Sequence, residues 1–333
     1  MATEAIARRG PRSWFSGREG AQKRFVAGVT LPAVAFLAIF SLLPIVWALL
    51  LGFFDFSPRR TGTPFLGLGG DNPFVGLENF GRMFDVSPDA PLDVRQFHTA
   101  LQVTLVFAFL IVPLNLAITL PLATMIESVA RRLRPVYRTI FFLPVLSSEV
   151  GVAVIWGFVL HPQNGLLNGL LTKITGKVTV VGWTTDPTLV FLGIPVALLA
   201  VIVAYLWQDI GYNLVIFIAA LQAIPQSVKD AARVDGASSW QTFRHITLPL
   251  LKPTILLASI LTMISAFQVF DLFQVMTNGG PQDQTRSLPL DIYRNAFRYQ
   301  RMGWAAAVSV VLFLIVFVIS LAQTRFLRTK WEY

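Results

Sequence analysis

Residues 227–253 read SVKDAARVDGASSWQTFRHITLPLLKP, a polar segment between two apolar stretches of the chain. Ser227 is followed three residues later by Asp230, a spacing typical of a capped helix start. Gly236 is the residue type that tolerates the left-handed conformation at a helix end. Ser238, with a glutamine three residues later, repeats the capping pattern. The segment therefore predicts two short helices joined at a glycine corner.

The two predicted helices offer different surfaces to a neighbour. The second carries Trp240 and Phe243, aromatic side chains of the kind that anchor protein interfaces. The first carries small residues, which permit close approach to another surface but bury little area in lipid. A pair of helices lying on the membrane surface is the alternative, and the small residues favour docking on another protein. These small residues are Ala231, Ala232 and Ala237.

The composition is that of an integral membrane protein. Of the 333 residues, 54% are hydrophobic and only 14% are charged, against about 25% charged residues in soluble domains. The absence of cysteine excludes a disulfide framework, a thiol nucleophile and a cysteine-ligated metal. The net charge of +9 comes from basic residues that flank apolar stretches. It therefore favours membrane orientation over binding of nucleic acid.

The apolar stretches predict six transmembrane helices, because one span needs about 20 mostly apolar residues. The stretch over 187–222 is longer than one crossing requires. We expect one span from about residue 188 that continues into a polar, cavity-facing part near Trp207–Asn213. The other five spans cover 25–52, 98–126, 140–160, 254–276 and 304–323.

The distribution of Lys and Arg predicts the orientation. With the N-terminus inside, the inner segments hold 17 basic residues in 78 positions and the outer segments hold 10 in 96. The chain then divides into a basic cytoplasmic tail over 1–24, a transmembrane domain over 25–323 with an inner loop over 226–249, and a cytoplasmic tail over 324–333. Both termini are predicted to be cytoplasmic.

The opening segment resembles the signature loop of ABC importer permeases. Aspartate stands where that family's EAA motif usually has glutamate. The residues at the spacing of the motif are Asp230, Ala231, Ala232, Gly236, Ile246, Leu248 and Pro249. Further blocks that resemble these permeases are FVGLENF (74–80), YRTIFFLPV (137–145), NGLLNGLL (164–171), LWQDIGYNLVIFIAALQAIP (206–225) and TNGGPQDQTRSLPLDIYRNAFRYQRMGWAAAVSV (277–310).

The resemblance is to the carbohydrate-uptake class and, within it, to the first of the two permease subunits, the MalF-like family. It implies an all-α integral membrane protein with the six transmembrane helices of the type I, MetI-like fold and a cytoplasmic coupling helix, in the plasma membrane of a prokaryote. It also implies four partners: a second homologous permease, two ABC ATPase subunits and an extracytoplasmic solute-binding protein. ATP and Mg would be bound by the ATPase subunits, with no cofactor on this chain.

In such a transporter the signature loop would sit in a cleft of the ATPase subunit and carry its motion into the spans. Asp230 and Asp235 are candidates for polar contacts to the ATPase, and Gly236 for the corner. The candidate coupling residues are Asp230, Ala231, Ala232, Arg233, Asp235, Gly236, Ala237 and Phe243.

Polar residues at membrane depth are costly and usually face a cavity. Amide, carboxylate and hydroxyl groups beside aromatic rings suit a carbohydrate cargo. Glu149 and Asn115 are weaker candidates, expected to be structural hydrogen-bonding partners, and the predicted spans hold no Lys or Arg, which favours a neutral cargo over a phosphorylated one. The candidate pathway residues are Gln208, Asp209, Tyr212, Asn213, Thr262, Ser265, Gln268 and Asp271.

No enzyme activity is predicted. The chain lacks the G-x-x-x-x-G-K-[ST] phosphate loop, and its three histidines are scattered, so neither a catalytic triad nor a metal site is expected. The main hypothesis is import of a mono-, di- or oligosaccharide. Two alternatives remain: the same machine with a polyol or glycerophosphodiester as cargo, and a secondary transporter driven by protons or sodium through Glu149, Asp209 and Asp271.

Overall fold

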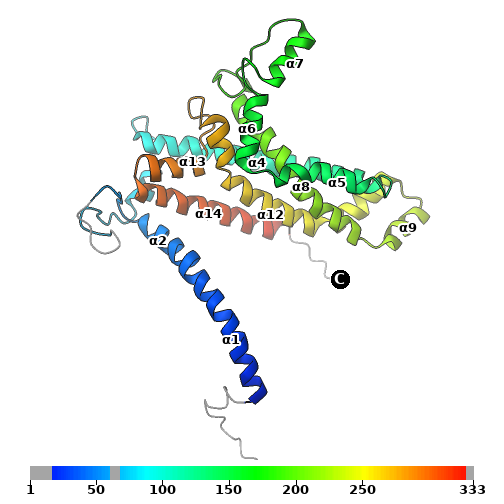
Figure 1. Cartoon of the computed structure of the whole chain (residues 1–333), viewed down its shortest axis with the longest axis horizontal. Coiled ribbons are helices and arrows are strands. Elements are labelled where there is room, and N and C mark those ends of the chain that lie inside the picture. The colour runs from blue at the N-terminus through cyan, green and yellow to red at the C-terminus, as the bar shows by residue number, and fades with distance from the viewer. Residues whose placement is uncertain (1–16, 61–67, 328–333) are drawn as a thin grey trace, which may run out of the picture.

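The computed structural model describes residues 17–60 and 68–327 of the chain (Figure 1). Five helical segments in these ranges are long and apolar enough to cross a membrane, and a bent helix pair supplies a sixth when it is counted as one span. The six-span helical architecture is therefore confirmed. The spans are α1–α2 (α1 Gly17–Leu37, a π-turn Ala38–Leu42 and α2 Leu43–Leu51), α4 (Leu92–Ser128), the pair α5 (Arg134–Phe142) and α6 (Glu149–Val159), α8 (Val196–Ala223), α12 (Lys252–Gln268) and α14 (Met302–Leu327).

The centre of the bundle is α4, which packs against α8 and α12. The buried ring of Phe107 on α4 lies 5.4 Å from the ring of Tyr205 on α8 and 5.0 Å from the ring of Phe273, just beyond α12. Both pairs are edge-to-face, a geometry that contributes about 0.5–1.5 kcal/mol beyond the area buried. This aromatic cluster holds α4, α8 and the end of the α12 span together.

The first span stands away from the bundle over most of its length (Figure 1). Its most apolar window contains no buried residue, and Phe25, Phe36 and Phe40 are all more than half exposed. The chain meets the bundle at Gly52, which lies directly after α2 against the backbone of Ala307 on α14. The apolar surface of this span is therefore left for lipid or another subunit.

The third predicted span, a single helix over 140–160, is wrong. The chain forms α5, a 3₁₀ turn and then α6, with a bend of 98° between the two arms. Pro144 lies in the turn, where it cannot supply a backbone donor to continue α5. The hydroxyl of Ser148 then accepts a hydrogen bond from the Gly151 backbone N–H and starts α6 as a new helix.

The start of α8 also differs from the prediction of about residue 188. A two-stranded hairpin, β1 (Val190–Phe191) and β2 (Ile194–Pro195), precedes the helix. Its turn places Leu192 and Gly193 at positive φ, which a helix does not permit. Apolar composition alone could not separate this hairpin from the span that follows it.

Short helices and turns connect the spans. Figure 1 shows α13 toward the end of the bundle opposite α9, while α7 projects from the side of the bundle beyond α6. Most of the predicted tails over 1–24 and 324–333 lies outside the described residues. The connecting elements are α3 (Glu78–Arg82), the 3₁₀ turn Leu143–Leu146, α7 (Leu166–Thr175), α9 (Gln226–Val234), α10 (Ser239–Thr242), α11 (Leu248–Leu250), α13 (Leu288–Tyr293) and the π-turns Phe243–Thr247, Phe273–Thr277 and Arg294–Arg298.

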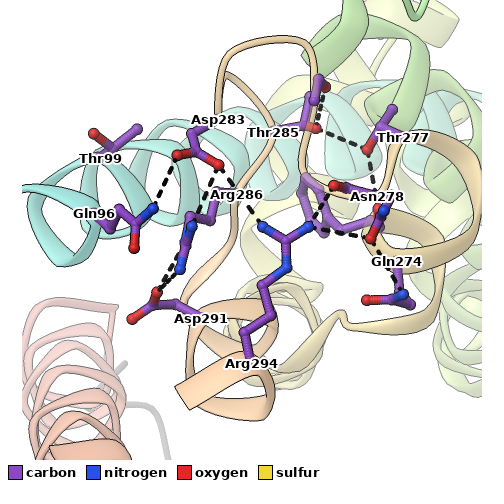
Figure 2. Close-up of polar contacts among 12 residues, drawn as sticks. Gln96, Thr99, Gln274, Thr277, Asn278, Asp283, Thr285, Arg286, Asp291 and Arg294 are labelled. Atoms are coloured by element: carbon purple, nitrogen blue, oxygen red, sulfur yellow. Dashed lines mark hydrogen bonds and ion pairs between the residues drawn. The ribbon is translucent and has the colours of Figure 1, made fainter. Parts of the chain in front are cut away.

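A charged network holds the segment between α12 and α14 (Figure 2). The buried guanidinium of Arg286 lies 2.7 Å from the carboxylate of Asp291 and 3.3 Å from that of Asp283. Asp283 also pairs with Arg294 and accepts a hydrogen bond from Gln96 on α4. Burial raises the pKa of Asp291, and Arg286 offsets only part of that rise. The network fastens this segment to α4.

Candidate pathway cavity and coupling segment

A cavity of about 380 Å³ lies between the bend before α6, the middle of α8 and the end of α12. Five of the eight predicted pathway residues line it. The complete lining is Val145, Glu149, Tyr205, Gln208, Asp209, Tyr212, Ser265, Gln268 and Val269. The cavity therefore brings together two stretches that sequence analysis named separately, and adds residues from a third.

Two predicted pathway residues are buried beside the cavity and do not line it. Asn213 donates to the side-chain oxygen of Asn115 on α4 at 2.8 Å and to the hydroxyl of Thr262 on α12 at 2.7 Å. Asn115 in turn donates to Asp209 at 2.7 Å and accepts from the Thr119 hydroxyl at 3.0 Å. These bonds form a polar cluster that joins α4, α8 and α12. Asn115 is thus a hydrogen-bonding partner, as expected.

The break in the third span contributes directly to the cavity wall. The amide of Gln208 donates to the backbone carbonyl of Ser147 at 2.9 Å, an acceptor that is free because the helix is interrupted there. Gly211 lies so close to the α5 backbone that an added Cβ would stand 2.3 Å from the Phe141 carbonyl oxygen. The eighth candidate, Asp271, follows the end of α12 and does not line the cavity.

Tyr205 is a lining residue that sequence analysis missed. Its side chain is 5% exposed, and its hydroxyl makes no hydrogen bond of acceptable geometry. Tyr205 precedes Gln208 by three residues and Asp209 by four, so it shares their helical face. That spacing was readable in the sequence. Glu149, expected to be structural, also lines the cavity.

The second capping prediction in the coupling segment, residues 226–249, is confirmed. The Ser238 hydroxyl accepts from the Gln241 backbone N–H, while the Gln241 side chain accepts from the Ser238 backbone N–H. Gly236 has a φ of +75°, so the glycine corner is also confirmed.

The first capping prediction is wrong, because α9 begins at Gln226, directly after Pro225, and Ser227 lies inside the first turn without capping it. The N-cap is Pro225, so the helix starts two residues earlier than a cap at Ser227 would set it. Asp230 instead accepts a hydrogen bond of 3.0 Å from Gln226 and one of 3.3 Å from Arg233 on the same helix.

The exposed side of the segment differs in part from the predicted contact face. Ala232 is 4% exposed and packs inside the chain, so it is not available to a partner. Val234, which sequence analysis did not select, is 87% exposed, and Trp240 is 65% exposed with its ring stacked on Phe243. The remaining candidates, Asp230, Ala231, Arg233, Asp235 and Gly236, are exposed, while Ala237 and Phe243 are half-buried.

A second cavity, of about 280 Å³, separates the coupling segment from the ends of α4 and α8. Glu127 on α4 lines it together with Lys229, Arg233 and Phe243. The Glu127 carboxylate lies on the α4 side of this cavity, and the basic and aromatic side chains lie on the coupling side. The coupling segment and the ends of α4 and α8 thus form a junction around this shared cavity.

A helical membrane protein with a polar cavity among its spans and an exposed helix pair at one end has the architecture of a transport permease. The chain belongs to the family of binding-protein-dependent transport system inner membrane components, which matches residues 116–330. This family confirms the predicted ABC importer permease and the prediction of a transport subunit in place of an enzyme. It also confirms the location in the membrane.

Curated relatives extend the similarity over most of the chain. It is 33% identical over 306 residues to the probable ABC transporter permease protein YurN of Bacillus subtilis, with 91% of this chain and 95% of that protein covered. It is 34% identical over 295 residues to the lactose transport system permease protein LacF of Rhizobium radiobacter, with 88% and 90% covered. To the sn-glycerol-3-phosphate transport system permease protein UgpA of Yersinia pseudotuberculosis it is 33% identical over 308 residues, with 92% and 95% covered.

The fold is also that of a solved transporter. A chain in the crystal structure of a bacterial ABC transporter involved in import of the acidic polysaccharide alginate superimposes with a TM-score of 0.77. The match covers 96% of this chain and 100% of that one at 23% identity. The permease fold thus includes the first span as well as the bundle.

Proposed function

We propose that the chain is one of two permease subunits of an ATP-driven importer that moves a carbohydrate across the plasma membrane of a prokaryote. The observation that carries this proposal is the cavity between α6, α8 and α12, where amide, carboxylate and hydroxyl groups meet an aromatic ring. These groups suit the hydroxyl-rich faces and apolar ring faces of a sugar. The lactose permease among the relatives supports the same cargo class.

We further propose that motion of the coupling segment transmits ATP-driven changes in the ATPase to the transmembrane helices. An ATPase subunit would hold the exposed face of α9 and α10, with Val234 and Trp240 as apolar anchors and Asp230 and Asp235 as polar contacts. Closure of two ATPase subunits on ATP and Mg would displace this segment. The inner ends of α4 and α8 would follow through the shared junction, opening the cavity on one side and closing it on the other.

The proposal includes an orientation in the membrane and two further partners. The α9 end would face the cytoplasm together with both termini, and the opposite end, which carries α13, would face an extracytoplasmic solute-binding protein. A second homologous permease would complete the wall of the cavity. This arrangement agrees with the excess of Lys and Arg in the inner segments.

Uptake by the reconstituted importer tests the proposal. Proteoliposomes that contain both permeases, the ATPase and the binding protein should accumulate a radiolabelled sugar only with internal ATP, and an ATPase variant that binds but does not hydrolyse ATP should abolish uptake. Uptake by the two permeases alone under a proton or sodium gradient would instead establish the secondary transporter. Because a relative is named for sn-glycerol-3-phosphate, that solute and a polyol belong in the same assay as the alternative cargo.

A further inference from the structure

The charged groups that face the pathway cavity are all acidic. Glu149 and Asp209 line it, and no Lys, Arg or His of the described residues does. Asp209 accepts a hydrogen bond from Asn115, but a neutral amide cancels none of its charge. The side-chain carboxylate of Glu149 has no hydrogen bond or ion pair within residues 17–60 and 68–327. Neither carboxylate is therefore neutralised by a cation from the part of the chain that the structure describes.

The helices around the cavity offer no basic residue nearby. In α6, α8 and α12 the single Lys or Arg is Lys252, the first residue of α12. It lies 13 residues before Ser265, which places it about 20 Å away along the helix axis. At such a distance its interaction with the cavity is weak compared with that of the lining carboxylates.

The hydroxyl of Tyr205 is an independent sign that a ligand belongs in this space. The side chain is 5% exposed and lines the cavity, and its hydroxyl makes no hydrogen bond of acceptable geometry, although the Ser265 hydroxyl lies near it. Buried hydroxyl groups nearly always make hydrogen bonds, because a buried hydroxyl without one costs folding free energy. A sugar hydroxyl in the cavity could pair with it. A cargo in contact with Tyr205 then lies beside both Asp209 and Glu149.

We propose that this cavity selects cargo by charge: it accepts uncharged and amino-bearing saccharides and rejects those that carry phosphate or carboxylate. The inference rests on the proposed function and narrows its substrate class. It predicts that this chain rejects anionic cargoes such as those named for its sn-glycerol-3-phosphate relatives and for the alginate transporter that it resembles in fold. An anionic group at Tyr205 would face two carboxylates without a compensating guanidinium or ammonium from the described residues of this subunit.

The electrostatic part can be measured without knowing the cargo. The chain has no cysteine, so Ser265→Cys places a single thiol of this subunit in the cavity, within the complete importer. Its modification is followed by mass with two methanethiosulfonate reagents of similar size, one bearing trimethylammonium and one bearing sulfonate. Leu166→Cys on α7, at a 71% exposed position, gives the ratio of the two rates outside the cavity.

The expected result is a cation-to-anion rate ratio at Ser265→Cys about tenfold or more above the ratio at Leu166→Cys. Adding Glu149→Gln and Asp209→Asn should bring the two ratios together. A ratio at Ser265→Cys equal to or below the control would overturn the proposal, because the second permease would then supply the missing cations. Sugar uptake by the importer that carries no substitution would be unaffected by that outcome, so the proposed function would stand.

Transport supplies the second measurement. In the reconstituted importer, glucose-, glucosamine- and glucuronate-based saccharides of equal length are compared after each is shown to bind the solute-binding protein. Uptake per bound cargo should be at least tenfold lower for the glucuronate series. Introducing Gln268→Lys into the cavity should raise the glucuronate value relative to the glucose value. Equal uptake of the neutral and anionic series would refute selection by charge even if ATP-driven import were established.

Discussion

The carboxylate of Glu127 at the end of α4 accepts a hydrogen bond of 2.9 Å from Arg134 at the start of α5. Glu127 also binds Arg138 on α5 and accepts from Gln222 on α8. One carboxylate thus joins three helices at the end of the bundle that carries the coupling segment. Its side chain is 18% exposed, so solvent screens the ion pairs only in part.

Replacing Glu127 by Gln should weaken this junction without changing its size. Hydrogen bonds to charged groups contribute about 1.5–3 kcal/mol, and in the proposed mechanism the loss falls where motion of α9 would reach the bundle. We expect ATP hydrolysis by the reconstituted importer to persist, while sugar imported per ATP falls several-fold. The matched control is Arg132→Gln, at an exposed position in the turn that follows α4. An unchanged ratio in Glu127→Gln would mean that motion enters through α12 instead.

Gly236 provides a test of the coupling corner. Its φ of +75° costs an L-residue about 1–2 kcal/mol, and proline cannot adopt it at all. Gly236→Pro should therefore distort the corner and uncouple ATP hydrolysis from uptake while leaving expression and docking of the binding protein intact. Gly236→Ala should do so more mildly, because a Cβ at this position meets no atom within 4 Å.

The control for the glycine corner is Gly169→Ala on α7. It also has open space around its Cβ and has no positive φ. Normal coupling in this control together with a defect in Gly236→Ala would attribute the defect to backbone conformation. Normal uptake by Gly236→Pro would show that the corner does not transmit motion.

The buried cluster around Asn213 should be cooperative. Asn213→Leu removes its bonds to Asn115 and Thr262, which leaves buried polar groups unpaired at a cost of about 1–3 kcal/mol. Thr262→Val removes one of the same bonds. The two substitutions together should lower the melting temperature of the purified importer by less than the sum of the single effects. Additive effects would mean that the two side chains are energetically independent.

The sequence predicts most of the spans because their signal is length and apolar composition, which α4 and α14 carry without interruption. It failed where a local backbone signal lies inside an apolar run. The bend between α5 and α6 depends on Pro144 and on the cap at Ser148, and neither changes the mean hydropathy of the stretch. The same applies to the turn at Gly193 before α8.

The polar residue types predicted which stretches of the chain lie near the cavity, but not which individual side chains line it. Gln208, Asp209 and Tyr212 line the cavity as expected, whereas Asn213, one residue further on, turns away to the cluster between helices. At 100° per residue, Asp209 and Tyr212 lie within about 100° of Gln208 around the helix, whereas Asn213 lies about 140° from it. Glu149 reaches the cavity because the bend redirects α6, which a straight helix over 140–160 could not indicate.

The ion pair of Arg286 and Asp291 should be the most sensitive feature of the segment between α12 and α14. Both side chains are at most 1% exposed, and burial raises the pKa of Asp291 despite the adjacent guanidinium. Arg286→Met would leave the Asp291 carboxylate buried without its partner, which typically costs about 3–5 kcal/mol. We expect a melting temperature several degrees lower for the purified importer, with Arg298→Met at an exposed position as the control.

A double variant tests whether the ion pair of Arg286 and Asp291 contributes net stability. Arg286→Met with Asp291→Leu removes both charges, and well-packed apolar replacements of buried ion pairs are often neutral or stabilising. Thermal unfolding of the double variant should therefore recover at least half of the loss seen in Arg286→Met. Asp283 would still hold Arg294 and Gln96, as Figure 2 shows, so the segment should keep its attachment to α4. A double variant as unstable as Arg286→Met would instead show that the pair contributes net stability that apolar packing cannot replace.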